Sequence, residues 1–124
     1  MKKNLTHISL VDEFQIAFGA RLGLNLSDCT LRVAGARIED CIRLEFYGET
    51  LLRATEKQVG LAARFGYDIT PSTRREAHAV IADIMEQIDR ETIIAEGLAA
   101  GVTVINKHDT HPMRYVIFSA HVRV

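Results

Sequence analysis

Two histidines and an aspartate lie close together near the C-terminus, in the stretch His108-Asp109-Thr110-His111, and His121 follows in a predicted strand. Imidazole and carboxylate are ligands that zinc or nickel accepts, so one reading is a metal-dependent enzyme built on this loop. Catalytic histidine pairs of metalloproteases lie on a helix with a fixed spacing, whereas this pair precedes Pro112 in a predicted loop. A solvated surface loop and a loop that contacts a partner are the other two readings.

Four basic residues make the middle of the chain a second candidate surface: Lys57, Arg64, Arg74 and Arg75. Arg74 and Arg75 fall in the first turn of a predicted helix, where backbone N–H groups can receive phosphate and where basic side chains oppose the helix dipole. A helix-turn-helix places such an N-terminus in the major groove of DNA, but the connection 66–72 is longer than is usual for that motif. The pattern predicts nucleic-acid contact or a solvated helix start whose charge Glu76 balances.

Tyrosine and arginine are common anchors at interfaces, and Tyr67, Tyr115 and Arg114 are candidates of this kind. Tyr67 follows Gly66, so packing against the end of a helix is its alternative role. The predicted partner-binding set therefore contains Lys57, Arg64, Tyr67, Arg74, Arg75, His108, His111 and Arg114.

Signatures of catalysis or nucleotide binding are missing from the sequence. No serine lies in an elbow of the form Gly-x-Ser-x-Gly, and there is no glycine-rich phosphate loop. The favoured reading therefore assigns no catalytic residue, no metal and no cofactor, and classifies the chain as a non-enzyme.

The composition is that of a globular protein, with 48% hydrophobic and 25% charged residues in a chain of 124. The formal charge of -1 gives no overall cationic field, so contact with nucleic acid needs a local patch. No apolar run approaches the roughly 20 residues of a membrane helix, and the first residues lack the apolar core of a signal peptide. We expect a single cytoplasmic domain, 1–124, without internal repeats.

Two helix-start signals separated by a glycine predict a helix pair in the middle of the chain. Thr55 to Gln58 and Thr73 to Glu76 both fit the capping box, and Gly66 lies where a left-handed helix terminus is expected. The predicted helices span about 56–65 and 73–89. Apolar residues at helical spacing form a stripe on the second helix: Ala77, Val80, Ile81, Ile84 and Ile88.

Alternation of apolar and polar residues predicts a hairpin on each side of the helix pair. The first spans about 29–47, with Ala34 to Arg37 as its turn and Phe46 on its buried face. The second spans about 102–124 and ends in a long strand. An exposed edge of this length invites pairing with another chain, so a homodimer through the C-terminal strand is the alternative to a sheet closed within one chain.

These elements predict an α+β fold, in which an antiparallel sheet from the two hairpins packs against the central helix pair. A weaker pattern predicts a further helix from Asp12 to Leu22. Replacing Ile81 or Phe46 by alanine should cost about 2–5 kcal/mol if both are core residues. Cys29 and Cys41 fall on two predicted strands, as a reduced, packed pair or as a disulfide between neighbouring strands.

The middle segment, residues 55–89, resembles a helical unit of small accessory proteins from phages, plasmids and other mobile elements. The shared pattern is T-x-K-Q, an apolar helix ending in glycine, and T-R-x-E-A at the start of the next helix. It is carried here by Thr55, Lys57, Gln58, Gly66, Thr73, Arg74, Glu76 and Ala77. The resemblance implies a mobile-element protein that works by binding, either as a DNA-binding accessory or as an inhibitor of host defence such as an anti-CRISPR protein.

Three functions follow from these observations. The favoured one is a non-enzymatic binding protein that acts on a protein or nucleoprotein partner, for example as an anti-defence inhibitor. The alternatives are a DNA-binding accessory or regulatory protein that uses the helix pair, and a metal-dependent enzyme at the loop of His108 and His111.

Overall fold

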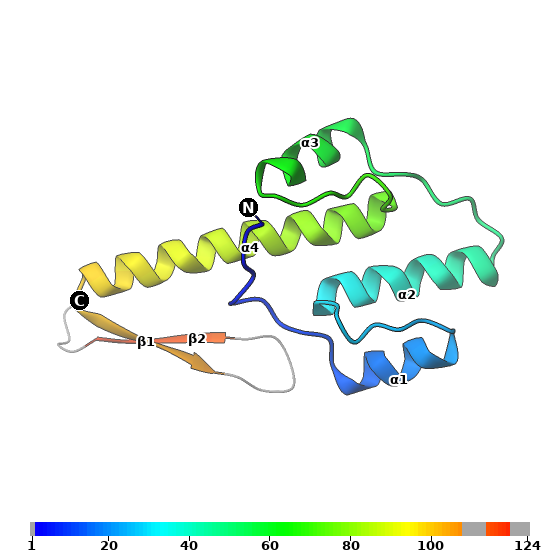
Figure 1. Ribbon diagram of the computed structural model, residues 1–124. Coiled ribbons are helices and arrows are strands. Elements are labelled where there is room, and N and C mark those ends of the chain that lie inside the picture. Colours follow the sequence, from blue (N-terminus) through cyan, green and yellow to red (C-terminus); the bar gives the residue numbers. More distant parts are fainter. Residues whose placement is uncertain (1, 108–113, 120–124) are drawn as a thin grey trace.

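The computed structural model describes residues 2–107 and 114–119, with side chains over 2–101. Within these residues the chain forms helices and one strand pair, in the order α1 (Glu13–Arg21), α2 (Leu31–Glu45), α3 (Glu56–Arg64), α4 (Arg74–Ala99), β1 (Val102–Lys107) and β2 (Arg114–Ser119). The long helix α4 runs through the molecule and contacts α2, α3 and β1, while α1 contacts α2 (Figure 1).

The predicted helix pair is confirmed. Thr55 caps α3 in a full capping box with Gln58, and Thr73 caps α4 by accepting from the backbone N–H of Glu76. Gly66 follows α3 with a φ of 86°, a left-handed conformation that glycine adopts at low cost. The second helix is longer than predicted because residues 90–99 continue it without a break.

The predicted helix from Asp12 to Leu22 is also present, as α1 with Asp12 and Gln15 in a capping box. The first hairpin, 29–47, is wrong, since α2 occupies most of this stretch. Thr30 caps α2 by accepting from the backbone N–H of Val33, and the predicted turn at Ala34 to Arg37 lies inside the helix. The same residues match helical spacing, because Val33, Ala36 and Asp40 are all buried on one side of α2.

The C-terminal strand prediction is met by β1 and β2, which pair antiparallel with Val102 opposite Ser119. The loop 108–113 and the strand end 120–124 lie outside the described residues. The α+β prediction is nevertheless wrong, because a single strand pair remains in the described part, and helices, not a sheet of two hairpins, pack against the helix pair.

The chain contains an internal repeat, contrary to the expectation from sequence. Residues 12–40 align with 55–83 without a gap, at a constant spacing of 43 residues (73 − 30), and eleven of the 29 aligned residues are identical. The most regular part reads T-x-R-x-A-x-A-x-I-x-D, from Thr30 to Asp40 and again from Thr73 to Asp83. We call 12–40 the first repeat and 55–83 the second repeat. Each is one helix–loop–helix unit.

The two repeats match in structure, down to single hydrogen bonds. Gly23 has a φ of 82°, close to that of Gly66 in the second repeat. The isolated bridge between Leu10 and Thr30 is reproduced between Arg53 and Thr73. The side chain of Gln15 donates to the Leu31 carbonyl at 3.0 Å, as Gln58 does to the Arg74 carbonyl at 3.3 Å. The sequence identity therefore reflects a repeated fold.

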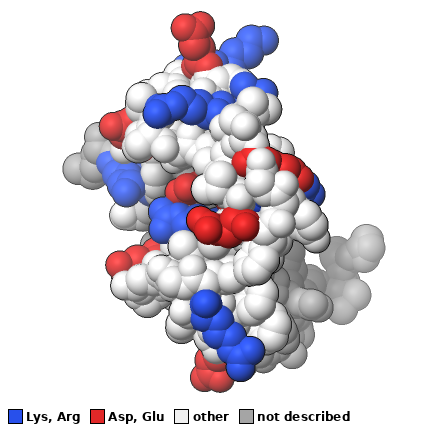
Figure 2. Space-filling model, turned by 90° about the vertical axis from the view of Figure 1, so that its right-hand side faces the viewer, with Lys and Arg blue, Asp and Glu red and all other residues white. Residues whose placement is uncertain are grey.

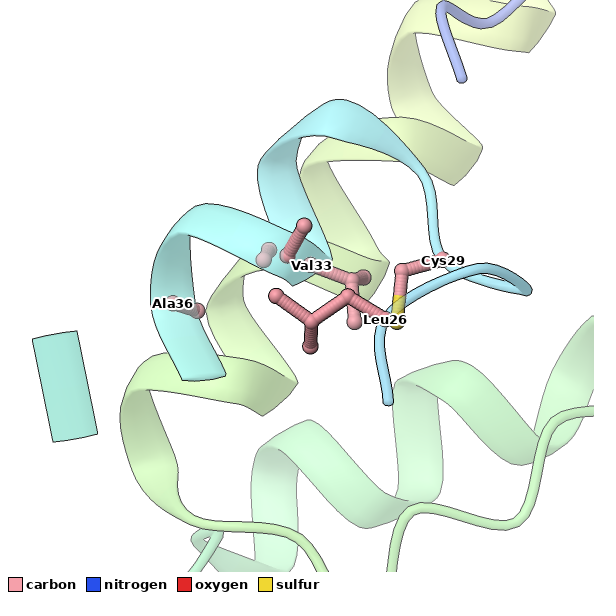
Figure 3. Close-up of a cluster of buried hydrophobic side chains, with 6 residues drawn as sticks. Leu26, Cys29, Val33 and Ala36 are labelled. Atoms are coloured by element: carbon pink, nitrogen blue, oxygen red, sulfur yellow. The ribbon is translucent and has the colours of Figure 1, made fainter. Parts of the chain in front are cut away.

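The repeats pack on each other through small residues where α2 meets α4. Ala34 and Ala36 of α2 share one buried cluster with Ala79 of α4, whereas Ala77, which corresponds to Ala34, is buried against Ala62 and Ile69 of its own repeat. Alanine allows two helix backbones to approach closely, and the larger buried side chains lie around this contact. Figure 3 shows Leu26 and Cys29, from the connection between α1 and α2, beside Val33 of α2, with α4 behind them.

Both cysteines are free thiols, but neither lies on a strand. Cys29 is buried just before α2, and burial raises the pKa of its thiol. Phe46 is not a core residue either, because it lies 70% exposed at the end of α2. In the described part of the chain, no helix has the length and apolarity needed to cross a membrane.

Candidate binding surface

Two buried aspartates join the repeats, and the first is Asp40 of α2. Its carboxylate accepts hydrogen bonds from the hydroxyl of Thr73, the N-cap of α4, and from Arg75 at 2.6 Å. Only 7% of Asp40 is exposed. A buried carboxylate needs such donors, and here both come from the first turn of the partner repeat's second helix.

The second is Asp83 of α4, which makes the same contacts in return. It accepts from the hydroxyl of Thr30, the N-cap of α2, at 2.5 Å and from Arg32 at 3.1 Å. Complete burial raises the pKa of the Asp83 carboxyl, although the bonds from Thr30 and Arg32 oppose this shift. We call the two sets, Asp40–Thr73–Arg75 and Asp83–Thr30–Arg32, the reciprocal clamp.

The clamp changes the interpretation of the two predicted contact arginines. Arg75 is held by Asp40 and lies 3.6 Å from Glu39, so it orders the interface between repeats. Arg74 is exposed and makes no ion pair within the described residues. Both arginines line one groove, but only Arg74 has its charge free for a ligand.

This groove lies between α2, the segment 49–52 and the start of α4, and has a volume of about 570 Å³. The other repeat has a counterpart that is much smaller, about 100 Å³, lined by the corresponding residues Ile8, Ser9, Leu31, Arg32 and Asp83 together with Glu86. An ion pair between Arg32 and Glu86 crosses the small groove. The duplication has thus left one groove open and one nearly closed.

Exposed apolar side chains gather where α2 ends. We define the α2-end face as Leu44, Phe46, Tyr47 and Leu52. Phe46 and Tyr47 are 70% and 72% exposed, and Tyr47 lines a further groove of about 460 Å³ with Ile38 and Ile42. Glu49 lines both this groove and the one at Arg74, so the two grooves adjoin.

Most of the charges around the α2-end face are paired within the chain, although Glu45 is exposed and forms no ion pair with the described residues. Arg43 forms ion pairs with Glu39 and Glu49, each at 3.0 Å. Figure 2, which faces the side where α2 ends, shows blue and red side chains interspersed with white surface and no continuous field of one charge. Apolar contact is therefore the chief means of binding that this face offers.

The other predicted site residues are dispersed. Lys57 and Arg64 lie exposed on α3, and no ion pair is formed by either within the part of the chain that is described. Tyr67 has a structural role, because its hydroxyl donates to the Lys3 carbonyl at 2.7 Å and its ring lies 4.7 Å from the Lys2 ammonium. Tyr67 also packs against the cluster of Ala62, Ile69 and Ala77 at the end of α3, which is the alternative role considered for it.

His108 and His111 lie outside the described residues, as do Asp109 and His121, so the metal-dependent reading stays a prediction. Arg114 is the first residue of β2. Among the residues that are described, no group of three histidine, cysteine or acidic side chains is placed to hold a metal ion.

Comparisons of the chain with protein-family models, with curated proteins and with solved structures give no match. The candidate surface therefore rests on the geometry of this chain. Sequence reasoning missed the α2-end face because a strand would have turned Phe46 toward the core. The signal that could have revealed it is the repeat itself, since Thr30 matches the helix cap Thr73 and predicts a helix after it.

Proposed function

We propose that this chain is a non-enzymatic binding protein that holds a protein or nucleoprotein partner through the α2-end face. The observation that carries the proposal is the exposure of Phe46 and Tyr47 beside two adjoining grooves. Large exposed apolar side chains in one patch are uncommon on proteins that bind nothing, and aromatic residues dominate the energetics of protein interfaces.

The resemblance of residues 55–89 to accessory proteins of mobile elements supports an inhibitory role. Such an inhibitor acts by covering a surface that its partner needs, which requires a stable fold and an apolar contact patch but no catalytic group. The reciprocal clamp supplies rigidity, because it fixes the start of α4 beside α2. Action in the cytoplasm and origin from a mobile element stay predictions.

The test is a quantitative capture experiment from host-cell lysate with three forms of the full chain. The double variant Phe46→Ser/Tyr47→Ser removes the aromatic part of the α2-end face, and Phe14→Ser removes an equally exposed phenylalanine from α1. We expect a protein that is recovered by the wild-type chain and by Phe14→Ser but lost with the double variant. If the double variant recovers every captured protein at wild-type level, the proposal is wrong.

A second candidate function is nucleic-acid binding by the helix pair. Three exposed cations on α3 and α4, Lys57, Arg64 and Arg74, form no ion pair with the described residues and favour it. Phosphate contacts release counterions, so affinity for a labelled DNA duplex should fall steeply with salt. Arg74→Ala should weaken binding at low salt. An affinity that does not change with salt would contradict this alternative.

A further inference from the structure

The groove beside Arg74, which we call the wide groove, differs from the small groove by a reversal of charge at one position. In the small groove, Arg32 contacts Asp83 at 3.1 Å and Glu86 at 2.5 Å, and the pair with Glu86 closes the groove. By the same spacing of 43 residues, the position of Glu86 is taken by Arg43 in the other repeat. Two arginines repel each other, so the matching bridge cannot form. The wide groove therefore stays open, at about 570 Å³.

The charged groups around the wide groove are otherwise paired with one another. Arg75 contacts Asp40 at 2.6 Å and lies 3.6 Å from Glu39. Arg43 contacts Glu39 and Glu49, each at 3.0 Å. A ligand that displaces none of these ion pairs must therefore find its counter-charge elsewhere in the groove.

Arg74 can supply that counter-charge. It lines the wide groove, is exposed and forms no ion pair with the described residues. Its counterpart at the start of α2 is Leu31, so the repeated fold does not require a cation there, and a cation opposes the dipole of the helix that it begins. His78, one turn further along α4, lines the same groove and has Gly35 as its counterpart. The wide groove thus carries two side-chain donors that the first repeat lacks.

Apolar surface continues from the wide groove toward the end of α2. Leu52, which is 57% exposed, lines the wide groove together with Leu51. Glu49 lines both this groove and the adjoining one, which presents Tyr47 and aliphatic side chains of α2. A ligand that extends across the two grooves meets the free cation in the first and an apolar wall in both.

We propose that the wide groove receives a carboxylate side chain of the partner protein, which accepts hydrogen bonds from the guanidinium of Arg74 and the imidazole of His78. Apolar side chains next to this acidic residue in the partner cover Leu52 and Tyr47. A guanidinium can form two parallel hydrogen bonds with one carboxylate, which fixes the direction of the contact. This inference rests on the proposed function and specifies the chemistry of the partner segment, an acidic residue beside apolar ones.

A strand of nucleic acid fits the same cation less well than a single carboxylate. Its backbone carries a negative charge at every phosphate. Glu49 lines the wide groove, and Glu45, at the end of α2, is exposed and forms no ion pair with the described residues. A strand that passed over these carboxylates would meet like charge, whereas one carboxylate at Arg74 would not. These charges favour an acidic peptide as the occupant.

The test selects short random peptides, displayed on phage, against the immobilised full chain. The affinity of the enriched peptide is then measured by fluorescence anisotropy. We expect enriched peptides in which an aspartate or glutamate lies next to apolar residues. Replacing that acidic residue by its amide should weaken binding about fivefold, which is the effect of losing a partly exposed ion pair.

Arg74→Leu is the matched variant of the chain, because it places at the start of α4 the residue type that starts α2. It should weaken binding of the acidic peptide about fivefold and leave binding of the amide form unchanged, since the two changes remove the same contact. Arg64→Leu removes another exposed, unpaired cation of the described residues, on α3 and outside both grooves. It should leave the affinity for the acidic peptide unchanged.

Two results would overturn the inference. One is that no acidic peptide is enriched, or that Arg74→Leu and Arg64→Leu bind the enriched peptide equally well. The other is that a labelled DNA duplex, added to the full chain, displaces the peptide and is itself bound more weakly by both variants, because the occupant of the groove is then nucleic acid.

The two proposals fail separately. A captured partner that Arg74→Leu binds with wild-type affinity, but that is lost with Phe46→Ser/Tyr47→Ser, supports the α2-end face and overturns the carboxylate contact. If the double variant recovers every captured protein at wild-type level while Arg74→Leu weakens the acidic peptide, the α2-end face is wrong and the carboxylate contact stands.

Discussion

The first and second repeats share a fold and differ in how their surfaces are completed. The backbone of Lys3 is hydrogen-bonded to the Phe65 carbonyl and to the Tyr67 hydroxyl of the second repeat, whereas the matching Leu22 carbonyl of the first repeat accepts no hydrogen bond from the described residues. The two grooves also differ, at about 570 Å³ beside Arg74 and about 100 Å³ beside Arg32, so the proposed partner has more room at the wider one. The comparison also identifies residues that serve the fold, because Thr30 and Thr73, which correspond, both cap a helix and bind the buried aspartate of the other repeat.

The largest expected effect tests whether the two repeats pack equivalently. Leu26 and Ile69 correspond, and both are almost completely buried. Replacing either by alanine should lower the free energy of unfolding by about 2–5 kcal/mol, because each leaves a cavity in its own cluster. Chemical denaturation measures this. A loss below about half a kcal/mol at one of the two sites would mean that the repeats do not share a core design.

Gly19 provides a smaller and more selective contrast. A Cβ atom at Gly19 would overlap the Leu26 side chain, although the matching residue of the second repeat is already alanine, Ala62. Gly19→Ala should therefore destabilise the chain by about 1–3 kcal/mol, despite the higher helix propensity of alanine. Stabilisation of the chain by this substitution, measured in the same denaturation experiment, would contradict the packing described for the first repeat.

The clamp predicts a pH dependence of stability. Burial raises the pKa of Asp83, so the folded chain binds more protons than the unfolded chain above the ordinary aspartate pKa of 3.8. The free energy of unfolding should then fall as the pH rises through the interval from 3.8 to the raised value. Asp83→Asn should remove this slope in urea titrations at a series of pH values.

Glu86 serves as the control of opposite sign. Burial alone would raise the pKa of its carboxyl, but hydrogen bonds from Arg32 and Arg90 outweigh burial and lower it. Its contribution to stability is therefore lost as the pH falls, and Glu86→Gln should flatten the acid side of the profile. The account is contradicted if Asp83→Asn and Glu86→Gln change the pH dependence of the free energy of unfolding in the same direction.

The smallest expected effect on stability is at the α2-end face. Phe46→Ala should change the free energy of unfolding by less than about half a kcal/mol, because the side chain is mostly exposed. The sequence had predicted a larger loss of stability for this variant, because it placed Phe46 on the buried face of a strand. The check is thermal unfolding of Phe46→Ala, at the end of α2, compared with Ile84→Ala, at a fully buried site of α4.

Local signals in the sequence predicted the helix pair, because Thr55 with Gln58, Thr73 and Gly66 act through neighbouring backbone groups. The same kind of signal was present at Thr30 but was outweighed by the alternation of residues 29–47. Residues 29–47 fit two alternating strands only if Ala34 to Arg37 are taken as a turn between them. Without that turn, the same residues also fit helical spacing. Comparing Thr30 to Asp40 with Thr73 to Asp83 resolves the ambiguity in favour of a helix.

The candidate surface was less predictable, for a physical reason. Whether Arg75 is free or held depends on Asp40, which lies 35 residues away in the chain and reaches it only through the contact of α2 with α4. The exposure of Leu44 depends in the same way on the path of the chain after α2. Local chemistry placed Arg74 and Arg75 together in the first turn of a helix but could not separate their roles in the groove that both line.

The most direct test of the account is hydrogen–deuterium exchange of the full chain, alone and with the captured partner. If the α2-end face holds the partner, amides from Ile42 to Tyr47 should become protected in the complex. Those at Phe65 to Tyr67, which are hydrogen-bonded to Lys3, should not change. Protection confined to α3 and the start of α4, with none near Leu44 or Tyr47, would contradict it.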